Sequence, residues 1–294
     1  MTTSFETLYQ NLQAAVDDEL QTLLCHHQPR LLWESMAYSV LGGGKRLRPL
    51  LCLLACEAVS GKWQPALPAA QAVELIHAYS LIHDDLPALD NDDWRRGKPA
   101  NHKEYGEDIA ILAGDALQTL AFQLLSDPAI RRPDVQVRWV AELAGAAGPM
   151  GMCAGQVLDL HAADSVWKEA EILDVYRRKT GALIRAAVRM GALAGGAGPE
   201  QLQALTGYAE DLGLAFQIVD DLLDLTGSFE ALGKTPGKDL MQDKKTYPAL
   251  LGQAEARQKV ESCLLRARDV LFSVPLLQTG HLLQIAEKLV HRET

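Results

Sequence analysis

The sequence predicts an all-α fold, and three observations lead to that prediction. Leucine and alanine recur every three or four residues along most of the chain, which is the period of an amphipathic helix. Alternating runs of β-branched residues, which are typical of strands, are nearly absent. The 294 residues show no change in composition that would mark a linker. We therefore expect one domain over residues 1–294, a single bundle of long helices around a central cavity.

The expected helices follow one another with short connections. In chain order they cover about 4–26, 31–41, 49–60, 68–86, 108–125, 135–147, 150–161, 167–194, 199–225, 247–272 and 276–291. Pro49 suits a first helical turn, where its missing N–H costs nothing. Pro87 ends the fourth helix, because the residue before a proline avoids the helical region. A polar, lysine-rich loop separates the ninth helix from the tenth.

Composition excludes several classes of function. A net charge of −10 argues against non-specific binding to nucleic acid and against binding to an anionic membrane surface. We expect no signal peptide from the first residues and no membrane span, because no apolar run approaches the roughly 20 residues that span a bilayer. The five cysteines are odd in number and lie in apolar stretches, which favours reduced thiols in the core. We expect a cytoplasmic protein with no stable membrane anchoring.

One stretch, residues 81–97, concentrates charge of both signs. It carries Asp84, Asp85, Asp90, Asp92 and Asp93, followed by Arg95 and Arg96. Five carboxylates within ten residues repel one another unless a cation lies among them. The arginines directly behind them suggest an anion as well, so the stretch suits a polyphosphate bridged by Mg²⁺. The alternative is a solvated acidic loop.

A second acidic group interrupts an apolar helix. Asp220 and Asp224 are four residues apart and so share one helix face, with Asp221 beside them. Carboxylates in an apolar run are costly to bury unpaired, so metal binding is a better explanation than a solvated face. Hard oxygen ligands without Cys or a His cluster favour Mg²⁺ over zinc. The two groups could face one another across a cavity and hold several Mg²⁺ ions against one diphosphate.

A glycine run followed by basic residues forms the third element, Gly42-Gly-Gly-Lys-Arg-Leu-Arg-Pro49. Glycines let a backbone approach an anion, and the following helix adds the positive end of its dipole. Lys45, Arg46 and Arg48 supply charge. The spacing is not that of a nucleotide P-loop. Beside two acidic groups, this element suggests a second anionic substrate with its own cationic pocket, although a flexible turn with surface charges is the alternative.

Together these stretches resemble the short-chain trans-prenyl diphosphate synthases, most closely the bacterial farnesyl diphosphate synthases. Leu81 through Pro99 resembles the family's first aspartate-rich motif, and Gln217 through Asp224 resembles the second. Gly43 through Pro49 resembles the isopentenyl diphosphate site. Ala113-Gly-Asp-Ala-Leu and Gly155-Gln-Val-Leu-Asp-Leu are further family signatures. The resemblance extends over nearly the whole chain.

The resemblance implies a role for each matching residue. The Mg²⁺ ions, three with bound diphosphate, would be held by Asp84, Asp85 and Asp90 on one wall and by Asp220, Asp221 and Asp224 on the other. The allylic diphosphate would contact Arg95, Lys179, Thr180, Gln217, Lys234 and Lys244. The diphosphate of isopentenyl diphosphate would contact Gly44, Lys45, Arg48, His77 and Arg96. Gln156 and Asp159 would line the cavity and orient metal-bound water. His83 is expected to be structural, and Asp92 and Asp93 to be solvated or paired with cations.

The implied reaction is a head-to-tail condensation that gives farnesyl diphosphate from dimethylallyl or geranyl diphosphate. Charge on the departing pyrophosphate would be neutralised by Mg²⁺ with Arg95, Lys179 and Lys234. The remaining allylic cation needs a cavity that excludes water, and the double bond of isopentenyl diphosphate attacks it there. Pyrophosphate is the expected base, so no protein base is needed.

Product length is a steric question at residues 79 and 80. Ser80 lies four residues before Asp84, about 5.4 Å below it along a helix, and Tyr79 lies beside Ser80. In the resembling family, bulk at this position closes the pocket, so Tyr79 favours a product of fifteen carbons. Geranylgeranyl and geranyl diphosphate synthases are the alternatives. Helix geometry alone does not direct Tyr79 toward the cavity.

Other classes of protein remain as alternatives. A class I terpene cyclase would not need Lys45 and Arg48, an HD-type phosphohydrolase would need further spaced histidines, and a non-catalytic subunit would lose one acidic motif. The resemblance implies a homodimer, for which apolar helix 109–125 could supply the interface. The loop 233–246 is the better candidate for a lid, ahead of the C-terminal tail from Lys288.

Overall fold

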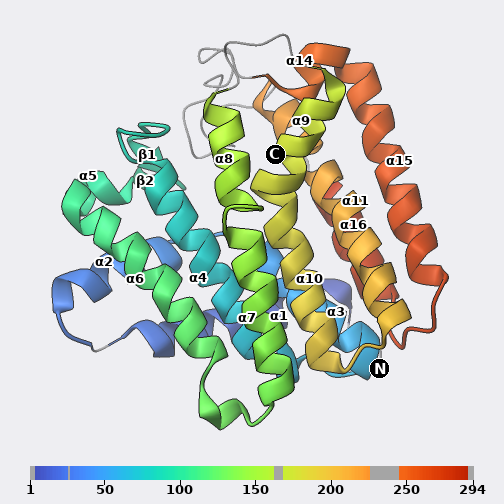
Figure 1. Cartoon of the computed structure of the whole chain (residues 1–294), viewed down its shortest axis with the longest axis horizontal. Helices are drawn as coiled ribbons and strands as arrows, with labels where there is room; N and C mark the ends of the chain where they lie inside the picture. The colour runs from blue at the N-terminus through green and yellow to red at the C-terminus, as the bar shows by residue number, and fades with distance from the viewer. Residues whose placement is uncertain (1–3, 26, 162–167, 226–244, 291–294) are drawn as a thin grey trace.

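The structure, a computed structural model, describes residues 4–25, 27–161, 168–225 and 245–290. Its helices are α1 (Phe5–Leu24), α2 (Arg30–Val40), α3 (Leu47–Ser60), η1 (Gln64–Ala66), α4 (Leu67–Asp84), α5 (Asn101–Tyr105), α6 (Glu107–Leu125), η2 (Pro128–Ile130), α7 (Pro133–Ala147), α8 (Met152–Leu160), α9 (Glu169–Tyr176), η4 (Arg177–Gly181), α10 (Ala182–Gly195), α11 (Pro199–Asp224), α14 (Tyr247–Leu251), α15 (Gln253–Phe272) and α16 (Gly280–Val290). The strands of the described residues are β1 (Trp94–Arg95) and β2 (Lys98–Pro99). The predicted all-α fold is confirmed (Figure 1).

Helices with small residues form the centre of the bundle. Most residues of α3, α4 and α10 are buried, because alanine, leucine and other apolar residues cover more than one face of each. Gly191 of α10 lies against the carbonyl of Cys52 in α3, where a Cβ atom would overlap that oxygen. The main apolar core draws residues from α1 through to α16. A second cluster joins α9, α11, α14 and α15.

The acidic stretch is followed by a small hairpin that the sequence analysis did not predict. Trp94 pairs with Pro99 and Arg95 with Lys98 in antiparallel register. Arg96 and Gly97, the two linking residues, have φ values of 54° and 73°, as a type I′ turn requires. The hairpin, α9 and α14 lie toward the upper end of the molecule in Figure 1.

Two of the expected long helices are interrupted. The helix expected over 167–194 is confirmed from Glu169 onward, but a turn of π-helix, η4, divides it into α9 and α10. The helix expected over 247–272 is divided at Gly252, whose φ of 88° ends α14 and starts α15. Glycine tolerates this backbone, which would strain other residues.

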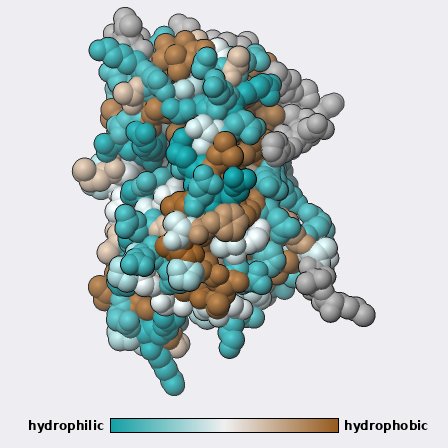
Figure 2. All heavy atoms as spheres, turned by 90° about the vertical axis from the view of Figure 1, so that its right-hand side faces the viewer, coloured by the Kyte–Doolittle hydropathy of each residue, from teal (hydrophilic) through white to brown (hydrophobic). Residues whose placement is uncertain are grey.

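The surface departs from two expectations of the sequence analysis. Cys52, Cys56 and Cys263 are buried free thiols, whereas Cys153 is exposed, so the assignment of all five cysteines to the core is wrong. By length and composition alone, the segment Glu107–Ile130 is apolar enough to cross a membrane, contrary to the expectation, and 33 % of its most apolar 18-residue window is buried in the bundle. On the face that carries α15, hydrophilic residues predominate around smaller hydrophobic patches (Figure 2).

Candidate active site

The two acidic groups line one pocket, as the sequence analysis predicted. The pocket has a volume of about 190 Å³. Asp84, Asp90 and Asp92 reach it from the end of α4 and the following turn, and Asp220 and Asp221 reach it from α11. Cationic and polar side chains complete the lining, namely Arg95, Lys179, Thr180, Gln217 and Lys245. Carboxylates on two walls with cations between them form a site for a metal-bridged polyanion.

The turn after α4 returns Asp90 toward Asp84, as Pro87 predicted. The amide of Asp90 donates to the carbonyl of Asp84 at 2.8 Å, and the amide of Asp92 donates to the carbonyl of Asp85 at 3.1 Å. These bonds fold the chain back over the end of α4. Burial raises the pKa of Asp84 to about 6 with a smaller contribution from the neighbouring Asp90, while Lys179 opposes the shift. The carboxylates therefore repel one another in the absence of a cation.

Asp85 points away from this pocket. It is buried and accepts hydrogen bonds from Arg95, whose Nε lies 3.1 Å from both carboxylate oxygens. Burial raises the pKa of Asp85, and Arg95 opposes the increase. Arg95 thus lines the carboxylate pocket and at the same time holds Asp85 in place through an ion pair. Lys103 pairs with Asp93 at 2.8 Å, and Arg95 lies 3.9 Å from Asp92, in agreement with the expected pairing with cations.

The second wall is fixed by a tyrosine that the sequence analysis missed. Tyr176 donates to Asp221 and accepts a hydrogen bond of 2.8 Å from the backbone amide of Tyr247. Gln217 also donates to Asp221, at 3.0 Å. Asp224 is buried, but it does not line the pocket. Its position three residues before the predicted Lys179 is the one feature of the sequence that could have pointed to Tyr176 as a site residue.

Among the described residues, no three Asp, Glu, His or Cys side chains lie close enough together to hold a metal ion as a ready-made group. Mg²⁺ in proteins is commonly held by one or two carboxylates together with substrate phosphates and water. The donors present are carboxylate oxygens on facing walls, namely Asp84 and Asp90 opposite Asp220 and Asp221. This donor set suits ions that bridge protein and diphosphate.

The π-helical turn η4 presents Lys179 and Thr180 to the pocket. Lys179 donates to Asp159 of α8 at 2.6 Å, and Thr180 donates to Gln217 of α11 at 2.6 Å. Gly155 of α8 makes this possible, since a Cβ atom there would overlap the backbone of Lys179. Single π turns often occur at functional sites, because the extra residue redirects side chains.

A second group of cations surrounds His77. Burial lowers the pKa of His77 well below its usual value, and Arg48, Arg96, Arg95 and Arg46 lower it further, so its imidazole is neutral. Burial lowers the pKa of Arg48 to about 10. Within the described residues, the Nε of Arg48 is buried and has no hydrogen-bond partner. Crowded cations with a buried unused donor favour an anionic ligand.

The glycine run packs directly on Arg96. The guanidinium of Arg96 donates to the carbonyl of Gly43, and a Cβ atom on Gly44 would lie 2.9 Å from that guanidinium. Gly44 has a φ of 128°, so both its backbone and its missing side chain are required. Arg46, however, turns toward the core and pairs with Glu74 at 2.7 Å, so its expected contribution to the anion site is wrong.

A larger apolar cavity of about 350 Å³ continues from the acidic pocket. The two share Leu81, Asp84, Lys179 and Thr180 in their linings. Apolar residues farther along include Leu89, Met152, Val157 and Leu160. Tyr79 and Ser80 line it, which α-helix geometry alone could not establish, and the Tyr79 hydroxyl lies 4.0 Å from the Cys153 sulfur. Arg48, His77 and Gln156 lie on the same cavity. The arrangement suits a ligand with a charged head and a hydrocarbon tail.

Several predicted positions lie away from the carboxylate pocket or outside the described residues. Lys234 and Lys244, and the loop 233–246 up to residue 244, lie outside the described residues. Lys45 is exposed on the glycine run. His83, which was expected to be structural, packs against Gly114 of α6 and bonds to the carbonyl of Ile111 at 3.1 Å, and it also lines the apolar cavity. Lys245 lines the pocket although the prediction selected its neighbour.

Comparison with known proteins decides the family. Residues 29–269 match the family model described as polyprenyl synthetase. The chain belongs to the polyprenyl synthetase family. It is 45 % identical over 282 residues to geranylgeranyl pyrophosphate synthase 7 of Arabidopsis thaliana, covering 95 % of this chain and 81 % of that protein. It is 47 % identical over 258 residues to a dimethylallyltranstransferase of Fischerella ambigua, covering 87 % and 75 %.

Solved structures of this family share the fold. An FPP/GFPP synthase of Zymomonas mobilis superposes with a TM-score of 0.86 at 37 % identity and covers 97 % of this chain and 98 % of its own. A geranyltransferase of Helicobacter pylori, complexed with magnesium and isoprenyl diphosphate, has a TM-score of 0.84 at 30 % identity, covering 99 % and 97 %. The chain is therefore a prenyltransferase of the trans-isoprenyl diphosphate synthase type.

Proposed function

We propose that this prenyltransferase condenses isopentenyl diphosphate with dimethylallyl and geranyl diphosphates, in the presence of Mg²⁺, to give farnesyl diphosphate and pyrophosphate. One observation carries the proposal: a pocket walled by two carboxylate groups opens into an apolar cavity that also receives Arg48 and His77. This joins a metal-diphosphate site, a second anion site and a hydrocarbon site. The Mg²⁺-dependence of the chain is part of the proposal, supported by the donor set and by the magnesium complex of the Helicobacter relative.

Different residues would assist different parts of the ionisation of the allylic diphosphate. Arg95 and Lys179 lie on the pocket and stabilise negative charge as the allylic carbon–oxygen bond breaks. Mg²⁺ held by the facing carboxylates would supply further Lewis-acid neutralisation of the departing pyrophosphate. The apolar lining from Leu81, Leu89 and Met152 would limit the access of water to the allylic cation.

Condensation then requires the second substrate in the adjoining site. Arg48, Arg96 and neutral His77 would bind the diphosphate of isopentenyl diphosphate, which aligns its double bond with the cation. The proton lost afterwards passes to pyrophosphate, so no protein base is invoked. The terpene-cyclase alternative has no use for this second cationic site.

The position of Tyr79 supports the proposed fifteen-carbon product. Its side chain is only 6 % exposed, lines the apolar cavity and touches Cys153, so it limits the length of hydrocarbon that fits. Geranylgeranyl diphosphate is the second candidate, because several relatives at 44–45 % identity are named geranylgeranyl pyrophosphate synthases. A geranyl product would require a shorter cavity.

Substitution on both walls tests the catalytic assignment. Asp84→Asn and Asp220→Asn should each lower kcat by about 100-fold or more. Each removes a carboxylate that would hold a Mg²⁺ ion, and with it the stabilisation of negative charge on the departing pyrophosphate. Asp134→Asn, an exposed aspartate on α7, is the matched control and should keep full activity. Full activity in either wall variant would contradict the proposed site.

We also propose that the protein acts as a homodimer in the cytoplasm. Ile111 and Leu112 of α6 are 44 % and 54 % exposed, and Val157 and Leu158 of α8 are 57 % and 41 % exposed. Exposed apolar residues on two helices favour burial against another chain. A second copy satisfies this need by self-complementary contact, since a two-fold interface uses the same patch twice.

A further inference from the structure

The loop formed by residues 43–46 has an unusual backbone conformation that depends on contacts with its neighbours. Gly43, Gly44 and Arg46 have φ values of 96°, 128° and 48°. For arginine the left-handed region is unfavourable, and such a conformation persists only where surrounding contacts determine it. The loop therefore depends on neighbours for the position of Lys45 and of the helix that follows.

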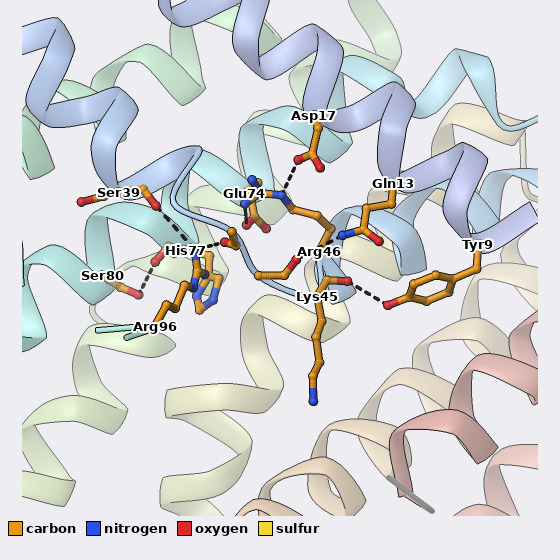
Figure 3. Close-up of polar contacts among 12 residues, drawn as sticks. Tyr9, Gln13, Asp17, Ser39, Lys45, Arg46, Glu74, His77, Ser80 and Arg96 are labelled. Carbon is orange, nitrogen blue, oxygen red and sulfur yellow. Dashed lines mark hydrogen bonds and ion pairs between the residues drawn. The ribbon is translucent and has the colours of Figure 1, made fainter. Parts of the chain in front are cut away.

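Helix α1 supplies three contacts to three consecutive loop residues. The Tyr9 hydroxyl donates to the carbonyl of Lys45 at 2.9 Å, and the Gln13 amide donates to the carbonyl of Gly44 at 3.2 Å. Arg46 donates to Asp17 at 2.7 Å. The three helix residues are spaced by four, so they form one stripe on α1. Figure 3 shows this stripe on one side of the loop, with Arg96 and His77 on the other.

These contacts orient peptide planes rather than merely covering the loop. A trans peptide is planar, so binding its carbonyl oxygen fixes the direction of the N–H in the same plane. Tyr9 and Gln13 thereby fix the two peptides on either side of Lys45. From the other side Arg96 bonds to the Gly43 carbonyl, so its guanidinium moves with the loop.

Tyr9 is itself held in place. The Phe5 ring meets it edge-on at 6.1 Å between centroids, and the Lys288 ammonium of α16 lies 4.2 Å from its ring centroid. Its ring position thus depends on packing, whereas its hydroxyl makes the hydrogen bond to the loop. Removing the hydroxyl therefore isolates the loop contact from the rest.

We propose that Tyr9 and Gln13 of α1 are positioning residues for the isopentenyl diphosphate site, acting through the backbone of Gly44 and Lys45. The inference rests on the proposed function. Neither residue lines the carboxylate pocket, so their effect is confined to the homoallylic substrate. A chain with a displaced loop keeps its allylic site and loses alignment of Lys45, Arg48 and Arg96 with the second diphosphate.

The test compares Tyr9→Phe and Gln13→Leu with the unaltered enzyme. Each should raise the KM for isopentenyl diphosphate by about two- to tenfold, the effect of one lost hydrogen bond, and leave the KM for geranyl diphosphate within about twofold. Calorimetric titration with isopentenyl diphosphate alone should show the same loss of affinity. Gln10→Leu, at an exposed position of the same helix, is the matched control and should change neither constant.

The possible results distinguish a failure of the proposed function from a failure of the proposed role of α1. Unaltered enzyme that makes no elongated product would overturn the proposed function. If it elongates normally and both variants keep its KM for isopentenyl diphosphate, only the role of α1 is overturned. Equal increases in both KM values, or a loss of thermal stability with no selective change, would show a merely structural role and would also overturn it.

Discussion

We propose that product length depends on Tyr79. Its ring packs edge-on against His83, and its hydroxyl approaches Cys153 of α8. His83 in turn is fixed by Gly114 of α6, where a Cβ atom would overlap the imidazole. The end of the cavity is therefore built from three helices, and the bulk of Tyr79 rests on a rigid support.

Shortening Tyr79 should lengthen the product. Tyr79→Ala removes the ring from the cavity, so the chain should grow past fifteen carbons to geranylgeranyl diphosphate or beyond, measured by chromatography of the dephosphorylated products. Tyr79→Phe keeps the ring and should leave the product unchanged. A Tyr79→Ala enzyme that still stops at farnesyl diphosphate would refute the steric assignment.

His77 should make stability depend on pH. Its pKa is lowered in the folded protein by burial and by the arginines around it, so below the unfolded pKa of about 6.5 the unfolded chain binds more protons. The free energy of unfolding should fall as pH decreases below about 6.5, by up to about 1.4 kcal/mol per pH unit, and be unaffected above it.

Denaturant unfolding at pH 7.5 and at pH 5.5 measures this dependence. His77→Gln removes the titrating group and should reduce the loss of stability between the two pH values. An identical loss in both proteins would show that other groups are responsible. The arginines Arg48, Arg96, Arg95 and Arg46 help to lower the pKa of His77. The pH dependence of stability therefore also reports on the density of positive charge in the proposed anion site.

At the scale of elements, the close approach of α8 to η4 shapes the catalytic pocket. Gly155 permits the approach, and Gly213 of α11 lies on another side of the same turn, where a Cβ atom would be 3.0 Å from the Cα of Gly181. The turn is thus packed between two glycines. This packing places Lys179 beside Asp159 and Thr180 beside Gln217.

Gly155→Ala should damage the site and the fold together. The added methyl group forces α8 away from the Lys179 backbone, which should destabilise the protein by about 1–3 kcal/mol and lower kcat by about tenfold or more. Thermal melting and steady-state kinetics check both effects. Gly145→Ala on α7 is the control: its Cβ atom meets nothing within 4 Å, so stability should rise slightly.

The sequence predicted the elements well where periodicity and apolar character are strong. The starts and ends of α6 and α11 agree with the prediction within a residue or two. The hairpin was missed because its strands have two residues each, too short for any alternation to show. The division at Gly252 and the π turn were missed because both depend on local backbone geometry and packing, which residue periodicity does not encode.

The candidate site was predicted to a similar extent. The two acidic walls, Lys179, Thr180 and Gln217 meet in one pocket as expected. The sequence could not show that Asp85 is turned to Arg95 or that Asp224 lies away from the pocket, since neighbouring aspartates on one motif look equivalent. Tyr176 and the α1 stripe were missed because their contacts join residues 29 to 71 positions apart.

At the scale of the whole molecule, the exposed face of α6 should mediate dimer formation. Leu112→Glu places a charge in the proposed interface, so the protein should sediment as a monomer or as a weakened dimer at micromolar concentration. Leu265→Glu is the control, because this residue is 52 % exposed on α15, on the other side of the molecule in Figure 1. Unaltered protein that sediments as a monomer would refute the homodimer.

The continuity of charged and apolar cavities through the bundle is best tested by the products themselves. Purified protein is incubated with Mg²⁺, isopentenyl diphosphate and dimethylallyl or geranyl diphosphate, and both pyrophosphate and prenyl products are measured. The proposed function predicts farnesyl diphosphate, with one pyrophosphate released for each condensation. Pyrophosphate release without elongation, or no release with either allylic substrate, would contradict it.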